Sequence, residues 1–411
     1  MENTKPVESE VRDELIGQVN GSQESTAPVR SLKELLDQVT GRNLMTPHLA
    51  EDSALAEVLP FPFLALVGQQ EMKLALTLAL INPIIGGVLL IGPRGTGKTT
   101  AVRSLVDLLP EVPHSLCYYG CLPEDIETGG IDAVCPDCAR KFAEGEPLVK
   151  MDRVRLVELP LNAGLGDVIG GVDERAASHN RFHLQKGLLA QADRNLLYVD
   201  EVNLLQDEVV DALLDAAAQG KYTVRRGPMS ATYHSRFVLI GSMNPEEGNL
   251  RPQIMDRFGL RVVVRGLEAP EERLKAYRRV QAYLSHPRGT IEQFALETAM
   301  AQAEIQAARD YLSEVVLPDE VAQAGLSLIS KLQIDSLRAE ITLFEAARAY
   351  AAADRRGTIT YEDLSVVAPM ALRLRRSKFI KDFVEYQNSE ESELAKVLNE
   401  VIQKLWSVNE S

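Results

Sequence analysis

Short apolar runs alternate with helix-patterned segments between about residues 59 and 268 of this chain. Nearly uninterrupted apolar runs of this length are typical of strands buried on both faces of a parallel sheet. Because helix-patterned segments separate the runs, the pattern predicts an α/β fold in which helices flank a parallel sheet. The expected strands are Val88–Ile91, Val157–Leu159, Leu196–Val199, Phe237–Ile240 and Arg261–Val264.

The pattern changes at Pro270. From there to about Arg376 nearly every segment has helical periodicity and is rich in Ala and Leu, which predicts an all-α domain over residues 269–376. Residues 1–58 are polar and have no sustained period, so we expect a mobile N-terminal arm. Residues 377–411 return to a helical pattern and are expected to form a C-terminal helical tail.

One apolar stretch, Leu74–Ile91, is about as long as a membrane-spanning helix. The pairs Asn82-Pro83 and Gly86-Gly87 interrupt it, so we predict a buried helix, a turn and a buried strand instead. The N-terminus is acidic and has no apolar core, which excludes a secretory signal. We therefore expect a soluble, cytoplasmic protein that does not bind membranes.

Composition supports a globular protein and narrows its partners. Of the 411 residues, 45% are hydrophobic and 25% are charged, and the formal net charge is −15. A chain with this charge repels the phosphates of nucleic acids and of anionic membranes. Binding to nucleic acid is therefore not expected, although a local basic patch would be compatible with the composition.

Residues 92–99 fit the phosphate-binding pattern G-x-x-x-x-G-K-[ST] at every position, after one expected strand and before an expected helix. The glycines let backbone N–H groups turn toward phosphate oxygens, and the helix start adds partial positive charge. In such a loop Lys98 contacts the β- and γ-phosphates, and the Thr99 hydroxyl binds Mg²⁺. The expected nucleotide-binding residues are Gly92, Pro93, Arg94, Gly95, Thr96, Gly97, Lys98, Thr99 and Thr100.

Two further strands end in polar residues that hydrolysis requires. Asp200 and Glu201 follow Leu196–Val199. We expect Asp200 to hold Mg²⁺, directly or through water, and Glu201 to polarise the attacking water. Phe237–Ile240 leads to Asn244, which we expect beside the γ-phosphate and this water. Together with the phosphate loop, these residues predict an enzyme that hydrolyses ATP with Mg²⁺.

Arg257 comes shortly before the helical domain. Phosphoryl transfer is accelerated by a cation that neutralises charge in the transition state, and an arginine finger from a neighbouring subunit is worth ~10³ to 10⁵ in rate. We expect Arg257 to be such a finger and Asp256 to orient it. An ordinary surface ion pair is the other interpretation of Arg257 taken by itself.

The order of these motifs is that of AAA+ ATPases, P-loop NTPases whose α/β core is followed by an all-α helical lid domain. From about Phe61 to Arg376 the sequence resembles the I subunit of magnesium chelatase. Val67, Gly68 and Gln69 match the segment that leads into this family's nucleotide site. The other segments that carry the resemblance are 197–205, 210–215, 237–248 and 250–259.

The resemblance implies several further features. Arg338 resembles the sensor arginine of the lid and is implied to contact the γ-phosphate in cis. Asp173–Leu188 and Tyr222–His234 resemble the family's helix insertion and hairpin. Members form hexameric rings that stack on a D subunit. Their ATP hydrolysis powers insertion of Mg²⁺ into protoporphyrin IX held by an H subunit. The same homo-oligomer, partners and place in chlorophyll or bacteriochlorophyll synthesis are implied for this chain.

Three other functions share parts of this pattern. A MoxR-type AAA+ chaperone, which remodels proteins or inserts other metals, would share every ATP residue. A nucleic-acid translocase would use Lys221, Arg225 and Arg226 beside the expected hairpin, but the net charge of −15 speaks against it. A scaffold that binds nucleotide without hydrolysing it is disfavoured because Lys98 and Glu201 are both present.

All four cysteines lie in one short segment, which we place in an insertion at residues 115–150. They are Cys117, Cys121, Cys135 and Cys138, two close pairs with thirteen residues between them. Four thiolates at such spacing favour a structural Zn²⁺ that would order an otherwise polar loop. An iron–sulfur cluster, redox-active thiols and four unrelated buried cysteines are the alternatives that the sequence leaves open.

Overall fold

The computed structural model describes residues 59–109, 111–172, 184–226, 229–248 and 250–375. The expected arm at residues 1–58, the expected tail at residues 377–411 and most of the expected insertion at Asp173–Leu188 lie outside these ranges. All described residues belong to the compact unit Leu59–Ser411.

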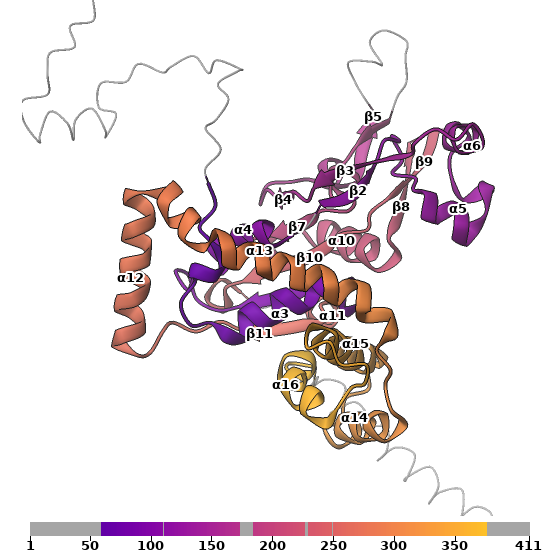
Figure 1. Ribbon diagram of the computed structural model, residues 1–411. Helices are drawn as coiled ribbons and strands as arrows, with labels where there is room; N and C mark the ends of the chain where they lie inside the picture. The colour runs from indigo at the N-terminus through magenta and orange to yellow at the C-terminus, as the bar shows by residue number, and fades with distance from the viewer. Residues whose placement is uncertain (1–58, 110, 173–183, 227–228, 249, 376–411) are drawn as a thin grey trace, which may run out of the picture. The chain divides into compact units, whose positions relative to one another are not determined.

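A five-stranded sheet lies at the centre of the described residues (Figure 1). Every strand pair in it is parallel, which confirms the fold class expected from the apolar runs. Strands β1 and β7 have the expected bounds, and the ends of the other three strands differ from expectation by at most three residues, most at β10, which continues to Met243. The strand order is β11 (Leu260–Val263), β1 (Val88–Ile91), β10 (Val238–Met243), β7 (Leu196–Val199) and β4 (Leu156–Leu159).

Successive side chains of β1 point to opposite faces of the sheet. Val88 and Leu90 pack into one hydrophobic cluster, whereas Leu89 and Ile91 pack into a second one. Both faces are therefore buried, which explains why the strands read as continuous apolar runs. The first cluster includes α3 (Gln70–Ile81) and α4 (Lys98–Ser104), and the second includes α7 (Leu165–Ile169), α9 (Leu188–Gln191), α10 (Asp207–Gln219) and α11 (Pro252–Arg257).

The long apolar stretch before the phosphate loop is a helix, a turn and a strand, as predicted. Helix α3 ends at Ile81, and the Asn82 side chain accepts a hydrogen bond from the Ile84 N–H at the start of η2 (Pro83–Ile85). Gly86 then turns the chain into β1 with a φ of 89°. Within the described ranges, no helix has the length and apolar character needed to cross a membrane.

The C-terminal third of the described chain is helical, as expected. Helix α13 runs from Pro287 to Tyr311, and Pro287 suits its first turn because an N–H group there would have no partner within the helix. Helix α15 packs against α3, so the lid touches the core (Figure 1). The other helices are α12 (Pro270–Ser285), α14 (Asp319–Lys331), α15 (Leu337–Ala353) and α16 (Tyr361–Leu372).

Three two-stranded antiparallel sheets extend from the core. The predicted hairpin is present as β8 (Lys221–Arg226) paired with β9 (Met229–His234), although its turn at residues 227–228 lies outside the described ranges. Strands β5 (Gly170–Val172) and β6 (Leu184–Lys186) also pair. The remaining short 3-10 turns are η1 (Phe63–Ala65), η3 (Leu105–Leu108), η4 (Ile131–Ala133), η5 (Val202–Leu204), η6 (Pro245–Glu247) and η7 (Leu312–Glu314).

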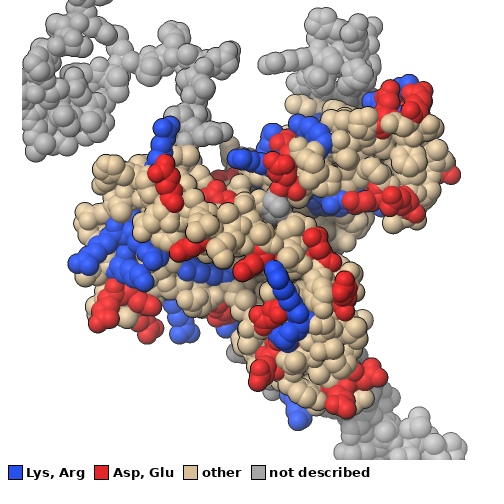
Figure 2. Space-filling model, in the orientation of Figure 1, with Lys and Arg blue, Asp and Glu red and all other residues tan. Residues whose placement is uncertain are grey.

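The cysteine-bearing insertion, which we expected to be a polar loop, contains strands and helices. Its stem is β2 (Glu111–Ser115) paired antiparallel with β3 (Val149–Arg153), and its tip carries α5 (Pro123–Gly129) and α6 (Pro136–Ala143). Each helix starts with proline, a residue well suited to the first helical position. Figure 2 shows acidic and basic side chains together on this tip, where Asp137 pairs with both Arg140 and Lys141.

Replacement of Gly259 by alanine tests how closely the chain packs before β11. A Cβ at this position would lie 1.8 Å from the Ile85 carbonyl oxygen, a backbone atom, so we expect Gly259→Ala to destabilise the protein. Overpacking of this kind costs about 1 to 3 kcal/mol. The measurement is the urea concentration at half-unfolding.

The matched control is Gly166→Ala in α7, where an added Cβ meets no described atom within 4 Å. We expect this helical substitution to leave stability unchanged or to raise it slightly. Equal midpoints for Gly259→Ala and the unaltered protein would contradict the close approach of Gly259 to Ile85.

Candidate functional site

The phosphate loop lies at the carboxyl edge of the sheet, the edge at which the parallel strands end. It begins directly after β1, and α4 begins within it at Lys98. Gly95 and Gly97 have φ values of 77° and 85°, a left-handed conformation that side chains with a Cβ rarely adopt. The loop therefore has the backbone form that turns N–H groups toward a phosphate, as its glycines predicted.

Lys98 is held against the loop. Its Nζ donates to the carbonyl oxygens of Gly92 and Pro93 at 2.7 and 2.8 Å, and the residue is only 8% exposed. Burial lowers the Lys98 pKa, while the carboxylates of Asp200, Glu201 and Glu247 act in the opposite direction. The ammonium group thus lies among negative charges, in a position to meet phosphate oxygens instead of carbonyl groups.

Thr99 and Asp200, the two expected magnesium-binding residues, lie together. The Thr99 hydroxyl donates to Asp200 Oδ2 at 3.3 Å. Asp200 Oδ1 accepts hydrogen bonds from the hydroxyl groups of Tyr198, at 2.9 Å, and Ser242. A carboxylate and a hydroxyl at this separation offer the oxygen ligands that Mg²⁺ prefers. Tyr198 and Ser242 were not identified from the sequence, although each is a polar residue inside an otherwise apolar strand.

Glu201 is oriented by its backbone and by two partners. It has a left-handed φ of 51°, and its N–H donates to Ser242 Oγ at 3.1 Å. Arg94 of the phosphate loop pairs with Glu201 at 3.1 Å and with Glu247 at 2.5 Å. The Arg94 side chain is 71% exposed, so these pairs are weak and a nucleotide could replace them at little cost.

Asn244 completes this group of polar residues. It is 2% exposed, and its Nδ2 donates to Glu247 Oε1 at 3.1 Å. Its Oδ1 accepts from the Glu246 N–H at 3.2 Å, which fixes the orientation of the amide. Glu247 was missed in the sequence analysis because its contacts with Arg94 and Asn244 follow only from the fold.

A mainly apolar cavity of about 430 Å³ adjoins the phosphate loop. Its lining includes Val67 and Gln69, the residues expected to lead into the site. Gly68 and Gln69 both have positive φ values, and Gln69 Nε2 donates to the Arg265 carbonyl at 2.6 Å. The other lining residues are Phe61, Ala65, Leu66, Met72, Gly95, Thr96, Gly97, Thr100, Gly266, Leu267, Arg273, Ala276 and Val280. An apolar cavity beside a phosphate loop suits the base of a nucleotide.

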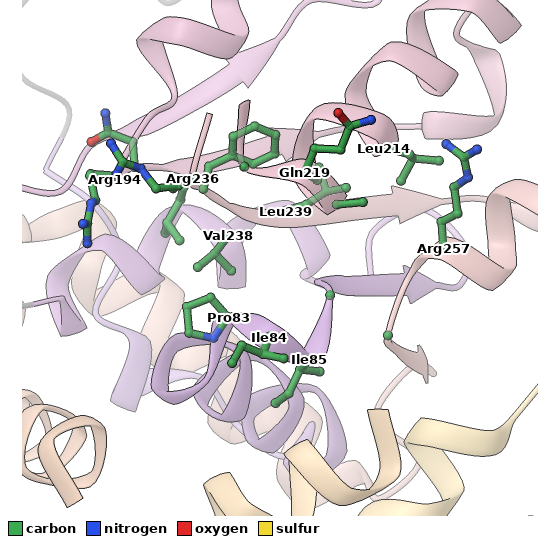
Figure 3. A pocket seen from close by; sticks show the side chains of 18 of the residues that line it. Pro83, Ile84, Ile85, Arg194, Leu214, Gln219, Arg236, Val238, Leu239 and Arg257 are labelled. Atoms are coloured by element: carbon green, nitrogen blue, oxygen red, sulfur yellow. The ribbon is translucent and has the colours of Figure 1, made fainter. Parts of the chain in front are cut away.

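Arg257 does not join these residues. Helix α11 returns the chain from the end of β10 to the start of β11, so Arg257 lies at the amino edge of the sheet, where the strands begin. There it lines a separate cavity of about 720 Å³. Figure 3 shows Arg257 at one end of this cavity and Arg194 and Arg236 at the other.

The expected pairing of Asp256 with Arg257 is wrong. Arg257 Nη1 donates to Asp215 of α10 at 2.6 Å. Asp256 instead accepts from Arg375 at 2.7 Å and from Arg261 at 3.4 Å. The neighbouring residues in sequence point to different partners, and the carboxylate that orients Arg257 comes from another helix.

Arg338, which the resemblance implies to contact the γ-phosphate in cis, also lies at the amino edge of the sheet. Its Nη1 is 3.8 Å from Asp256 Oδ2, and it lines the same cavity as Arg257. The whole length of the sheet separates this edge from the phosphate loop of the same chain. Arg257 and Arg338 therefore lie together at the edge of the sheet opposite the phosphate loop.

The four cysteine thiols form a second site. The structure brings the Sγ atoms of Cys117, Cys121, Cys135 and Cys138 within 4.8 Å of one another. The cluster lies in the insertion, outside the residues expected to bind MgATP.

The fold and the phosphate-loop residues define an AAA+ ATPase. The AAA domain family model matches residues 86–242, and the AAA lid domain family model matches residues 314–397. The sequence is also 41% identical over 322 residues to a magnesium-chelatase subunit ChlI homolog from Methanocaldococcus jannaschii, covering 78% of this chain and 87% of the relative. This chain belongs to the magnesium chelatase I-subunit family.

A plant relative agrees with this assignment, and two solved structures are similar to parts of the chain. The chloroplastic magnesium-chelatase subunit ChlI-2 of Arabidopsis thaliana is 43% identical, with 77% of this chain and 76% of the relative covered. A solved complex of the magnesium chelatase subunits BchI and BchD contains a chain 38% identical to this one (TM-score 0.43, 79% and 99% covered). A candidate ATPase from Cytophaga hutchinsonii, 20% identical with a TM-score of 0.50, shares the fold over 76% of this chain and 83% of its own.

Replacement of Glu201 by glutamine tests its role in hydrolysis. The phosphate loop and Asp200 are unchanged, so we expect Glu201→Gln to bind MgATP normally. Loss of a positioned base lowers turnover ~10² to 10⁴-fold. The measurements are nucleotide affinity by fluorescence titration and phosphate release at saturating ATP.

The matched control is Glu208→Gln, which removes an exposed carboxylate from the first turn of α10. We expect full turnover from this control. Normal turnover in Glu201→Gln would show that another group activates the water.

Proposed function

We propose that this ATPase forms a ring in which each chain supplies arginines to the nucleotide site of its neighbour. The observation that carries this proposal is the placement of Arg257 and Arg338 at the amino edge, with Thr99, Asp200 and Glu201 at the carboxyl edge of the same sheet. A head-to-tail contact between the two edges repeats around a closed ring. It would complete one site at every interface.

The ion pairs of the amino edge are compatible with this role. Asp215, the partner of Arg257, is 58% exposed, so the pair contributes little to stability and can exchange for a phosphate. Arg338 is 51% exposed and lies 3.8 Å from its carboxylate partner. Both guanidinium groups can thus reach a γ-phosphate presented by a neighbouring chain. Such a cation stabilises the charge that develops during phosphoryl transfer.

Arg338 connects this chemistry to motion of the lid. It begins α15 in the helical domain, whereas its partner Asp256 lies in α11 of the core. A γ-phosphate in the neighbouring site would compete with Asp256 for Arg338. ATP hydrolysis in one chain would therefore change the contact between core and lid in the next chain, which provides the mechanical output of a ring motor.

The output that we propose is insertion of Mg²⁺ into protoporphyrin IX held by an H subunit, with a D subunit stacked on the ring. Membership in the magnesium chelatase I-subunit family supports this substrate and these partners. Mg²⁺ has a tightly held hydration shell, so its transfer into a porphyrin is a step to which ATP hydrolysis can be coupled.

The direct test is an assay of Mg²⁺ insertion with matched D and H subunits. Insertion is measured by the change in pigment fluorescence. We expect insertion only when this chain and ATP are both present. Glu208→Gln should support insertion and Glu201→Gln should not. ATP hydrolysis without insertion, in the presence of partners that work with another I subunit, would favour a MoxR-type chaperone instead.

Mixing two inactive variants tests the arginine contribution across the interface. Glu201→Gln keeps the arginine, and Arg257→Ala keeps the glutamate. In an equal mixture about a quarter of the interfaces would combine an intact Glu201 with an intact Arg257 from the neighbour. We therefore expect ATP hydrolysis to recover well above that of either variant alone.

Mixing either variant with itself supplies the baseline, and an equal mixture of Arg257→Ala with Arg257→Lys controls for effects of mixing. Arg257→Lys keeps a charge but lacks the forked guanidinium. A mixture of Glu201→Gln and Arg257→Ala that stays at the baseline would indicate that Arg257 acts only within its own chain, or not on the nucleotide.

A further inference from the structure

We propose that the four thiols of the insertion bind one Zn²⁺ as a closed tetrathiolate site. The Sγ atoms lie within 4.8 Å of one another, and all four cysteines are free of disulfides. Cys121 and Cys138 are buried, and Cys117 and Cys135 are partly buried. This site is separate from the ATP chemistry, and its existence does not depend on the partners proposed above.

The distances between the sulfur atoms fit this metal. Zn²⁺ about 2.3 Å from each thiolate, at the centre of a tetrahedron, places neighbouring sulfurs about 3.8 Å apart. Cys117 Sγ is 3.7 Å from Cys121 Sγ and 3.5 Å from Cys135 Sγ. In a disulfide the two bonded sulfur atoms would lie about 2.05 Å apart. One disulfide would also not explain why the other two sulfur atoms lie close by. An iron–sulfur cluster holds its thiolates around several iron atoms and needs a wider cage.

Local backbone geometry supports thiolates at two of these positions. The Tyr119 N–H donates to Cys117 Sγ at 3.2 Å, and the Cys135 N–H donates to Cys121 Sγ at 3.4 Å. Gly120, with a φ of 82°, closes the tight turn between Cys117 and Cys121. Backbone N–H groups directed at sulfur stabilise its negative charge, as outer partners of metal ligands do.

The second cysteine pair lies at the start of α6. Cys135 precedes the first turn, and Cys138 is the one buried residue of this helix. The positive end of the helix favours thiolates over thiols there. The first cysteine pair lies in a turn that contains Gly120, and the second lies at the start of α6. Both segments thus place their sulfur atoms in the same cluster.

The insertion has too few apolar contacts to hold its tip together otherwise. Its hydrophobic cluster contains three buried residues, Cys121, Cys138 and Leu148, and two of them are thiols. Helix α5 has no buried residue at all. A small hydrophobic core contributes little to the folding free energy of a small structural unit, and metal binding can supply the rest. Zinc would therefore be a structural requirement of the tip, because a closed site has no position open for a substrate.

The tip is fastened to the strands that lead to the ATP site. Arg236 donates to the Gly120 carbonyl at 2.7 Å and to Asp125 at 3.0 Å. It also pairs with Asp193 at 3.2 Å. Asp193 and Arg236 come just before β7 and β10, the strands that end at the catalytic carboxylates and Asn244. Tyr119 packs against Tyr233 of β9 with ring centres 5.7 Å apart.

Metal analysis of the intact protein, purified without chelators or added metal, is the first experiment. We expect about one Zn²⁺ per chain. The reduced, metal-free protein should also take up Co²⁺ with the intense visible bands of tetrahedral thiolate coordination, and Zn²⁺ should displace it. Detection of iron together with acid-labile sulfide would overturn the proposal. It would also be overturned if the purified protein contained no zinc and the fully reduced protein took up no Co²⁺.

Variants locate the site. Cys135→Ser should weaken zinc binding by more than the ~10- to 100-fold that loss of an outer partner costs. Asp132→Asn removes an exposed carboxylate from the same insertion and should bind zinc normally. Equal zinc affinity in Cys135→Ser and the unaltered protein would place the metal elsewhere and contradict the assignment.

Hydrogen exchange tests the structural role without relying on a variant that folds. Removal of zinc from the intact protein should deprotect α5 and α6, and protection of α10 in the core should change little. Re-addition of zinc should restore the original exchange rates. Unchanged exchange in α5 and α6 after verified removal of the metal would show that zinc does not order the tip.

Discussion

In a parallel sheet all strands begin at one edge and end at the other, and this asymmetry organises the molecule. The phosphate loop, the Asp200–Glu201 pair and Asn244 follow different strands, yet they meet because β1, β7 and β10 end together. Helix α11 then returns the chain to the opposite edge, which places Arg257 there. The distance between the two groups is a property of the sheet, so small movements of side chains cannot bring them together within one chain.

Asp256 fixes how the lid meets this opposite edge. Its carboxylate lies between the guanidinium groups of Arg261 and Arg375, whose side chains are both 0% exposed. Burial lowers the pKa of both arginines, and Asp256 opposes that effect by stabilising their charge. Arg375 also donates to Thr342 of α15, at 3.2 Å, so core and lid share one buried ionic network. A buried charge costs much free energy when it has no partner. This cost favours the one arrangement of lid and core in which both arginines keep their contact with Asp256.

Local patterns in the sequence were enough to predict which residues gather at the carboxyl edge of the sheet. The loop at residues 92–99 and the acids after β7 depend on neighbours in the chain, and the structure brings Thr99 and Asp200 within hydrogen-bonding distance. The partners of Asp256 and the position of Arg338 depend on contacts between distant segments, which local patterns do not reveal, and the expected pairing of Asp256 with Arg257 was wrong. Glu247 was missed for the same reason. The helices of the insertion were missed because they have only seven and eight residues, about two turns, which is too short for an apolar period to be recognised.

The stem of the insertion has a consequence for how such proteins diverge. Glu111 lies opposite Arg153 in the β2–β3 pair, so the chain leaves the core and comes back at nearly the same place. Everything beyond that pair can be lengthened, shortened or replaced with little effect on the spacing of the strands below it. The thiol-bearing tip can therefore be gained or lost during evolution as one segment, while the residues that bind and hydrolyse the nucleotide stay unchanged.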